Sequence, residues 1–247
     1  MIRIGLIECG RNLDRWTAEY GGFADWFPPF LGLAGDALEY ETFRADLREL
    51  PATPEACDAW LLTGSPASVY EDLPWQTALT AFVRRAAPLC PIIGVCYGHQ
   101  HLHAALGGAV AKDAQWGVGI QTYAIAELPA WLPADVARDS AAGLRLIALH
   151  QDQVTAAAPG SRLLAGNPAC PLGVTTIGEN VLTFQAHPEM APGQASEIYD
   201  FHRQRIGPAR AESAKASLAG PRDDLLAARW IVAFLEHRLA QQEQWKP

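Results

Sequence analysis

The stretch from Pro91 to Gln100, PIIGVCYGHQ, constrains the fold more than any other part of this chain. Its first half is apolar and short, which is typical of a buried strand, and the pattern from His99 to Leu106 is typical of a helix. Cys96 stands where the strand turns into the helix, with a glycine two residues to either side. Glycines remove the Cβ clashes that such a sharp turn would create. We therefore predict a strand-turn-helix corner that presents the side chain of Cys96.

The thiol at this corner is a candidate nucleophile. It would lie over the positive end of the helix, which favours the thiolate, the nucleophilic form of cysteine. The alternative is a structural cysteine buried after a core strand, which is the commonest fate of a free thiol. The G-x-C-x-G spacing around Cys96 favours the nucleophile.

Short apolar segments in the first part of the chain are predicted to form strands. They cover residues 2–7, 38–43, 59–62 and 92–95. A helix from Pro74 to about Ala87 precedes the last of them. Strands separated by helices and ended by glycine-rich turns indicate a parallel sheet with right-handed crossovers. Ligands collect at the carboxyl ends of such strands, where both Gly64-Ser65 and Cys96 are predicted to lie.

The chain from Ala109 to Thr183 is predicted to be an antiparallel or mixed β region, because short apolar pieces alternate there with turn signals. Gly178-Glu179-Asn180 is typical of a hairpin turn. Helices are expected over residues 196–205 and 223–242, joined by a linker over 206–221 that is rich in Ala, Gly and Pro. We expect one domain over residues 1–205, with a linker and C-terminal helix over residues 206–247 that packs on it.

Aromatic residues are concentrated between Trp16 and Phe30. Two interpretations fit this run: a first helix and loop that pack against the sheet, or the wall of a pocket. Packing is the more common use of large apolar side chains and is favoured here.

The composition limits the classes of partner and compartment. The 247 residues carry a net charge of −8 with no basic stripe, which argues against nucleic-acid binding. The five cysteines are scattered and form no CxxC pair, so we expect neither a zinc site nor a disulfide framework. There is no leader-like N-terminus and no apolar run long enough for a membrane span. We expect a soluble, reduced, cytoplasmic protein that needs no metal and no cofactor.

A cysteine nucleophile needs a base, and the base needs a group that orients it. His187 is the candidate base because it follows an apolar strand and is fixed by Pro188, and Glu189 can turn back towards its imidazole. The alternative for His187 is a structural histidine at a strand end. Other histidines compete with it for the role of base: His99, His101, His103 and His150.

An acyl-transfer site also needs donors for the developing oxyanion. The backbone N–H of Tyr97, directly after the nucleophile, is one candidate. The turn at Gly64-Ser65 is the second, because a glycine lets the backbone approach a ligand closely. A plain turn between a strand and a helix is the alternative at that position.

Three separated motifs resemble those of one family. GVCYGHQ and FQAHPE, preceded by LTGSPAS, resemble the motifs of class I glutamine amidotransferases, the triad type with a cysteine nucleophile. The match runs from about Cys57 to Glu189. The resemblance implies an α/β fold with a flavodoxin-like, mostly parallel sheet flanked by helices, and a small antiparallel β region.

The resemblance also implies a role for each residue of the site. Cys96 would attack a side-chain carboxamide to give a γ-glutamyl thioester. His187, oriented by Glu189, would protonate the leaving group and then activate water. Gly64 and Tyr97 would donate hydrogen bonds to the oxyanion.

Substrate contacts are implied at four positions. Gln100 matches the family position that contacts bound glutamine, and Ser65 lies in the small-residue turn beside the site. Trp116 and Gly117 fall where the family shapes the glutamine pocket, although the sequence there departs from the usual acidic-Tyr-Gly pattern. This departure leaves the substrate open.

Within the family, the chain looks closest to stand-alone members that resemble the amidotransferase domain of GMP synthetase, and to γ-glutamyl peptidases. EDLPW and ALHQDQV support this likeness, and no G-x-x-x-x-G-K-[ST] phosphate loop occurs. We therefore expect a cysteine-dependent glutaminase that hydrolyses the γ-amide of glutamine or of a γ-glutamyl compound. The ammonia or amine would be released or passed to a synthetase partner.

Two alternatives to this function stay open. One is a γ-glutamyl peptidase that acts on glutathione-like conjugates, and the other is a non-catalytic binding module on the same fold. The presence of Cys96, His187 and Glu189 together argues against the module. The sequence determines neither the leaving amine nor the oligomeric state.

Overall fold

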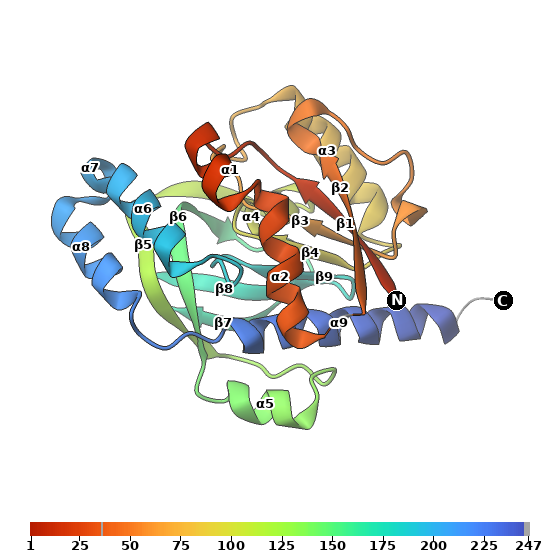
Figure 1. Ribbon diagram of the computed structural model, residues 1–247. Helices are drawn as coiled ribbons and strands as arrows, with labels where there is room; N and C mark the ends of the chain where they lie inside the picture. Colours follow the sequence, from red (N-terminus) through yellow and green to blue (C-terminus); the bar gives the residue numbers. More distant parts are fainter. Residues whose placement is uncertain (36, 245–247) are drawn as a thin grey trace.

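The computed structural model describes residues 1–35 and 37–244. Its strands form a nine-stranded sheet in the order β2-β1-β3-β4-β9-β8-β7-β5-β6, with helices on both faces (Figure 1). The strands are β1 (Ile2–Glu8), β2 (Leu38–Arg44), β3 (Ala59–Leu62), β4 (Ile92–Val95), β5 (Ala109–Ile125), β6 (Leu144–Ala156), β7 (Ser161–Asn167), β8 (Cys170–Ile177) and β9 (Val181–Phe184). The α-helices are α1 (Asp14–Tyr20), α2 (Phe27–Leu31), α3 (Pro74–Ala86), α4 (Tyr97–Ala105), α5 (Ala134–Ser140), α6 (Pro192–Phe201), α7 (Arg203–Ile206), α8 (Pro208–Ser217) and α9 (Asp224–Gln244). Short 3₁₀ helices are η1 (Phe23–Trp26), η2 (Gly32–Ala34), η3 (Ala45–Leu47) and η4 (Pro54–Ala56).

The sheet has a parallel half and an antiparallel half. The strands β2-β1-β3-β4-β9 pair in parallel, which is the flavodoxin-like order. The strands β8, β7, β5 and β6 extend the sheet with antiparallel pairs. Both parts of the predicted fold class are confirmed. The predicted hairpin turn joins β8 to β9, and Gly178 in it has a φ of 57°.

Helices cover both faces of the central strands, which is why these strands are apolar throughout rather than alternating. Along β3, Leu61 packs in one buried cluster with residues of α2 and α9. Trp60 and Leu62 point the other way and pack with α3 and α4. Figure 1 shows α2 and α9 together on one side of the sheet. The parallel strands thus bring Gly64, after β3, and Cys96, after β4, to the same edge.

The structure corrects two details of the second half. Helix α5 lies within the segment predicted to be an antiparallel or mixed β region, where it begins directly after Pro133. The predicted linker over residues 206–221 is wrong, because helix α8 occupies most of it. Pro208 stands in the first turn of α8, where proline is well tolerated, and the alanines that follow favour a helix. The Pro and Gly content of the segment therefore led to the wrong prediction of a linker.

The C-terminal helix α9 packs against the body of the chain. Trp230 and Phe234 are buried in the cluster that contains α2. The division of the chain at residue 205 stays a prediction, and residues 245–247 of its second part lie outside the described residues. No helix of the described chain is both long and apolar enough to cross a membrane.

Candidate active site

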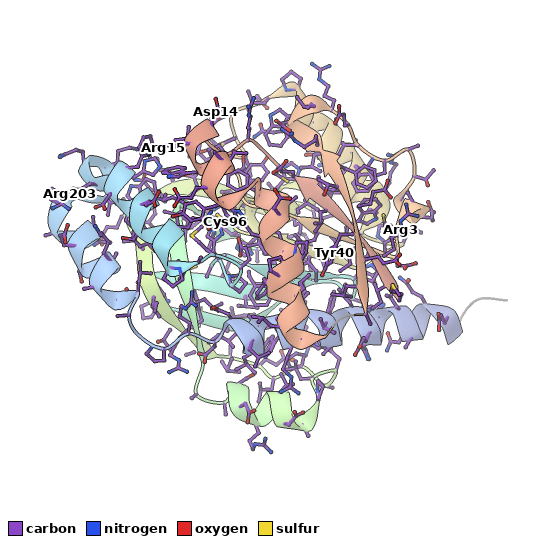
Figure 2. All side chains as sticks on the ribbon, in the orientation of Figure 1. Arg3, Asp14, Arg15, Tyr40, Cys96 and Arg203 are labelled. Carbon is purple, nitrogen blue, oxygen red and sulfur yellow. The ribbon has the colours of Figure 1, made fainter. Side chains whose placement is uncertain are left out.

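The predicted corner at Cys96 is present between β4 and α4, and Figure 2 shows Cys96 among side chains that project from α1 and α6. Cys96 has a φ of 53° and a ψ of −103°, which residues with a Cβ rarely adopt. Its N–H donates to the Phe184 carbonyl at 2.8 Å, and Gln100 N–H donates to its carbonyl at 3.0 Å. These bonds hold the backbone in a conformation that costs about 1–3 kcal/mol.

Two glycines permit the close packing of this corner. A Cβ on Gly98 would overlap the carbonyl of Leu62, and a Cβ on Gly94 would overlap Leu102 and the backbone of Gly98. Gly98 N–H donates to the Thr63 carbonyl at 3.1 Å. The glycines therefore bring the first turn of α4 against the end of β3.

His187 and Glu189 follow β9 and lie beside the corner. His187 Nδ1 is 2.7 Å from Glu189 Oε1, and both side chains are buried. His187 N–H donates to the Ile147 carbonyl at 2.8 Å, which attaches this loop to β6. With Nδ1 directed to the carboxylate, Nε2 is the nitrogen left for Cys96.

The charge state of His187 depends on these two neighbours. Burial alone would lower the pKa of the imidazole. The Cys96 sulfur and the Glu189 carboxylate overcome this effect and raise the pKa of His187 well above its usual value. An imidazolium paired with Cys96 is the consequence at neutral pH.

Three of the competing histidines support the packing of α4 instead. His99, His101 and His103 are buried and hydrogen-bond to hydroxyl groups of Thr or Tyr residues. Burial lowers the pKa of His101 and His103 to about 4, so both are neutral. The cavity at Cys96 is lined by none of the three.

Gly64 lies close to both Cys96 and His187. A Cβ on Gly64 would stand 3.1 Å from His187 Cε1 and 3.8 Å from Cys96 Cβ. Neither Gly64 N–H nor Tyr97 N–H finds an acceptor within the part of the chain that the structure describes. Both groups are therefore available to a ligand at this position.

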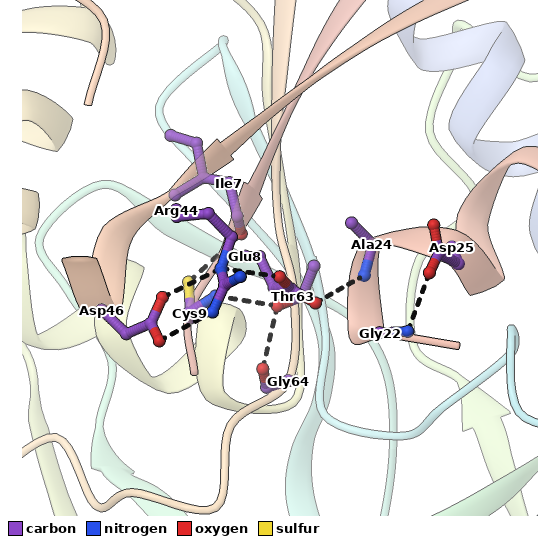
Figure 3. Close-up of polar contacts among 10 residues, drawn as sticks. All are labelled: Ile7, Glu8, Cys9, Gly22, Ala24, Asp25, Arg44, Asp46, Thr63 and Gly64. Carbon is purple, nitrogen blue, oxygen red and sulfur yellow. Dashed lines mark hydrogen bonds and ion pairs between the residues drawn. The ribbon is translucent and has the colours of Figure 1, made fainter. Parts of the chain in front are cut away.

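Thr63 fixes the turn that carries Gly64, and sequence reasoning missed it (Figure 3). Its side chain is fully buried. Its Oγ1 accepts from Cys9 N–H at 3.0 Å and donates to the Gly64 carbonyl at 2.9 Å. The hydroxyl thus joins the end of β1 to the turn after β3, two segments far apart in sequence.

Glu8 performs a similar task for the aromatic run (Figure 3). Its carboxylate accepts from Ala24 N–H at 3.4 Å and pairs with Arg44 Nε at 2.9 Å, which attaches η1 to the end of β1. Burial raises the pKa of Glu8, against the opposing effects of Ala24 N–H and Arg44. An acidic residue at the end of a buried strand was the available sequence signal.

A cavity of about 300 Å³ opens in front of Cys96 and His187. Its lining includes the predicted residues Gly64, Ser65, Gln100 and Trp116. The aromatic run of residues 16–30 divides between the two interpretations left open for it. Phe27 and Phe30 pack in the core and do not line the cavity, whereas Trp16 and Trp26 are buried in a second cluster and also line the cavity, together with Phe23.

A family model described as glutamine amidotransferase class-I matches residues 35–203. The chain belongs to this family. Two of its relatives carry different names. Gamma-glutamyl peptidase 4 of Arabidopsis thaliana is 29% identical over 175 residues, which are 69% of this chain and 68% of the relative. A glutamine-hydrolyzing GMP synthase of Aromatoleum aromaticum is 31% identical over 139 residues, 53% of this chain and only 25% of the synthase.

A solved structure has the same fold as this chain. The glutamine amidotransferase from Methylobacillus flagellatus superposes with a TM-score of 0.71 and 22% identity. The match covers 97% of this chain and 94% of that chain. At this identity the likeness supports the fold and leaves the substrate open.

Two of the predicted substrate contacts differ from the prediction in this structure. Gln100 lines the cavity, but its Nε2 already donates to the Asp152 carbonyl at 2.8 Å and to Gln185 Oε1 at 3.1 Å. Of the side-chain amide of Gln100, only the carbonyl oxygen Oε1 remains to bind a ligand. Gly117 does not line the cavity, and a Cβ there would stand 2.5 Å from His150 Nε2. Gly117 therefore makes room for the His150 ring.

His150 is the one of the four competing histidines that lines the cavity. Burial and the nearby His187 lower the pKa of His150 to about 4, so the ring is neutral. Neither ring nitrogen has a partner among the described residues. Asp152 follows it along β6, with its carboxylate held by Ser68 Oγ at 2.5 Å and Tyr70 OH at 2.8 Å. No group of three or more metal-ligating side chains occurs in the described chain.

Proposed function

We propose that this protein hydrolyses the γ-amide of glutamine or of a γ-glutamyl compound through a thioester on Cys96. One observation carries the proposal: a strained, fixed Cys96 lies beside His187, whose pKa is raised and whose Nδ1 contacts Glu189 at 2.7 Å. A structural cysteine would need neither the strain nor a charged imidazole beside it.

In the first half of the reaction, the Cys96 thiolate attacks the γ-carbonyl carbon. The carbonyl oxygen becomes an oxyanion, which Gly64 N–H and Tyr97 N–H stabilise. The His187 imidazolium then donates its proton to the departing nitrogen. The C–N bond breaks, ammonia or an amine leaves, and a γ-glutamyl thioester remains on Cys96.

In the second half, His187 is neutral and acts as a base. It takes a proton from water, the water oxygen attacks the thioester carbon, and the C–S bond breaks. Glutamate leaves, and the thiolate and imidazolium of Cys96 and His187 are restored. Glu189 holds the imidazole in the same orientation in both halves and stabilises its charged form.

The cavity wall also offers groups for the glutamyl part of the substrate. Asp152 is the carboxylate on the wall and suits an α-ammonium group. The Gln100 carbonyl oxygen, the Ser65 hydroxyl and Trp116 complete the proposed contacts. His150 is neutral and offers one donor and one acceptor.

The relatives suggest two identities for the leaving group. Some are called γ-glutamyl peptidases, which points to an amine, and others are glutamine-hydrolyzing synthases, which points to ammonia for a synthetase partner. A non-catalytic binding module is disfavoured, because Cys96, His187 and Glu189 are all present and in contact range.

Hydroxylamine provides a direct test of the thioester. We expect the protein to convert glutamine or a γ-glutamyl amide to γ-glutamyl hydroxamate, because hydroxylamine attacks the same thioester as water. Mass spectrometry of acid-quenched protein should place a glutamyl adduct on Cys96. If neither the hydroxamate nor the adduct forms with any member of a γ-glutamyl panel, the proposed function is wrong.

The hydroxyl of Thr63 provides a second test. We expect Thr63→Val to lower kcat by roughly tenfold, because the Gly64 turn loses the bond that holds its carbonyl. Cys9 N–H also loses its acceptor, so the midpoint of thermal unfolding should fall.

Thr63→Ser keeps the hydroxyl and is the matched control, with kcat within about threefold of the wild type. If Thr63→Val kept the kcat of the wild type, the hydrogen bond from Thr63 to the Gly64 carbonyl would not be needed for catalysis.

A further inference from the structure

Aromatic side chains form one part of the cavity wall. We call this part the aromatic chamber, and its members are Trp16, Phe23, Trp26, Trp116 and Phe201. They come from α1, η1, β5 and the end of α6. Phe23 and Trp26 pack edge to face with ring centroids 5.1 Å apart. Aromatic rings from four elements therefore line the same cavity as Cys96.

Hydrogen bonds and ring contacts join α1 to α6 at the aromatic chamber. Trp16 Nε1 donates to Glu197 Oε2 at 3.2 Å, and Tyr20 OH donates to Glu197 Oε1 at 2.7 Å. The rings of Trp16 and Phe201 meet edge to face at 5.3 Å. The Arg15 guanidinium lies 4.7 Å and 4.8 Å from the centroids of these two rings (labelled in Figure 2). The chamber walls are thus formed before any ligand binds.

The ring of Trp116 is held by contacts with two neighbouring side chains. Its ring stacks on His202 at 5.5 Å with an interplanar angle of 28°, and the Arg205 guanidinium lies 5.3 Å from its centroid. Its Nε1 is buried and has no hydrogen-bond partner among the described residues. A buried donor without a partner at a cavity wall points to a ligand that accepts a hydrogen bond.

Cationic side chains line the cavity despite the net charge of −8 of the chain, although one of them, Arg11, pairs with Asp14 at 2.9 Å. Arg11, Lys112 and Arg205 all line the cavity. Arg205 lies within 4.0 Å of no carboxylate in residues 1–35 and 37–244. A guanidinium without an ion pair beside an aromatic face suits a ligand that combines a ring with a carboxylate.

Ammonia would make no use of these walls, because it is small and polar. We propose that the aromatic chamber binds the leaving group, and that this leaving group is an aromatic amino acid. The substrate class is then a γ-glutamyl dipeptide with a C-terminal aromatic residue, whose carboxylate meets Arg205. This assignment rests on the proposed thioester hydrolysis and concerns only the half of the substrate that leaves first.

The first test compares γ-glutamyl-phenylalanine with γ-glutamyl-glycine on the wild-type protein. Both leaving groups are α-amino acids of similar basicity, so their kcat/KM ratio reports binding in the chamber. We expect a ratio of roughly 10 to 100 in favour of phenylalanine, as is usual for an apolar pocket. In hydroxylamine, the ratio of hydroxamate to glutamate should be equal for both dipeptides, because they share one thioester.

The second test uses variants of the chamber. Phe201→Ala should lower the phenylalanine-to-glycine ratio by roughly tenfold. Leu33→Ala removes a side chain that is also exposed, on η2 and away from the cavity, and should leave the ratio unchanged.

A third variant tests whether the positive charge of Arg205 binds the carboxylate of the leaving group. Arg205→Gln should lower the preference for γ-glutamyl-phenylalanine over γ-glutamyl-phenethylamide, which lacks the carboxylate, by roughly 3- to 10-fold. Arg203→Gln is the matched control on the same helix, because Arg203 pairs with Glu212 and does not line the cavity (labelled in Figure 2).

The outcomes separate this proposal from the proposed function. Equal kcat/KM for the two dipeptides, with a hydroxamate still formed, would overturn the aromatic chamber and leave the thioester in place. Unchanged ratios in both Phe201→Ala and Arg205→Gln would overturn it as well. If no γ-glutamyl compound is turned over, the proposed function fails, and the chamber assignment fails with it.

Discussion

Replacing Cys96 by serine is expected to lower kcat/KM for every γ-glutamyl substrate by at least about 1,000-fold. The serine side chain fits the same corner, but a hydroxyl is far less acidic than a thiol, so His187 keeps Glu189 as a partner but has no thiolate to pair with. The measurement is amide hydrolysis at saturating and limiting substrate. Intact-mass analysis should find no glutamyl adduct on the variant.

The control for this variant is a second buried cysteine. Cys57 is 4% exposed, lies in the core cluster with α3 and does not line the cavity. Cys57→Ser should change turnover by less than about threefold. A glutamine-like chloroketone should alkylate Cys96 alone, and full turnover by Cys96→Ser would refute the nucleophile.

Replacing His187 by asparagine is expected to lower kcat by about 10²- to 10⁴-fold. The variant has no group that can protonate the leaving nitrogen or activate water. Asparagine keeps a polar side chain of similar size, so the fold should survive and far-UV circular dichroism should be unchanged. A loss of less than about tenfold would exclude the acid–base role.

The dependence of activity on pH provides a second test of the acid–base role of His187. Because the pKa of His187 is raised, the wild type should keep its activity through neutral pH and lose it on the alkaline side, where the imidazolium loses its proton. That alkaline limb should vanish in His187→Asn. The two groups titrate as a pair, so the limb reports Cys96 and His187 together.

The stability of the fold should depend on pH in the same direction as the activity. A raised folded-state pKa means that the imidazolium stabilises the fold fully below its unfolded value of 6.5 and loses this contribution as pH rises through the folded value. The unfolding midpoint of the wild type relative to His187→Asn should therefore decrease above about pH 6.5.

The parts of the site that could be predicted are those encoded locally. Glycine spacing around Cys96 determines the corner, and the short distance from His187 to Glu189 along the chain determines their contact. The parallel sheet follows from the alternation of apolar strands and helices, and it brings Gly64 to Cys96. These features need only neighbouring residues and one topology rule.

The parts that could not be predicted depend on contacts between distant segments. Gly117 is needed because the His150 ring on β6 packs against it. Thr63 is needed because its hydroxyl binds a backbone N–H at the end of β1. Trp16 and Glu197 join α1 to α6 at the aromatic chamber and lie 181 residues apart. Periodicity within one segment carries no information about such partners.

The positive φ of Cys96 means that the proposed nucleophile destabilises the fold that carries it. Glycine adopts this conformation without strain, so an inactive chain with glycine at position 96 would hold the same corner more comfortably by about 1–3 kcal/mol. Screening variants for heat resistance alone would thus reward loss of the thiol. Any effort to make this protein more robust has to select for turnover at the same time.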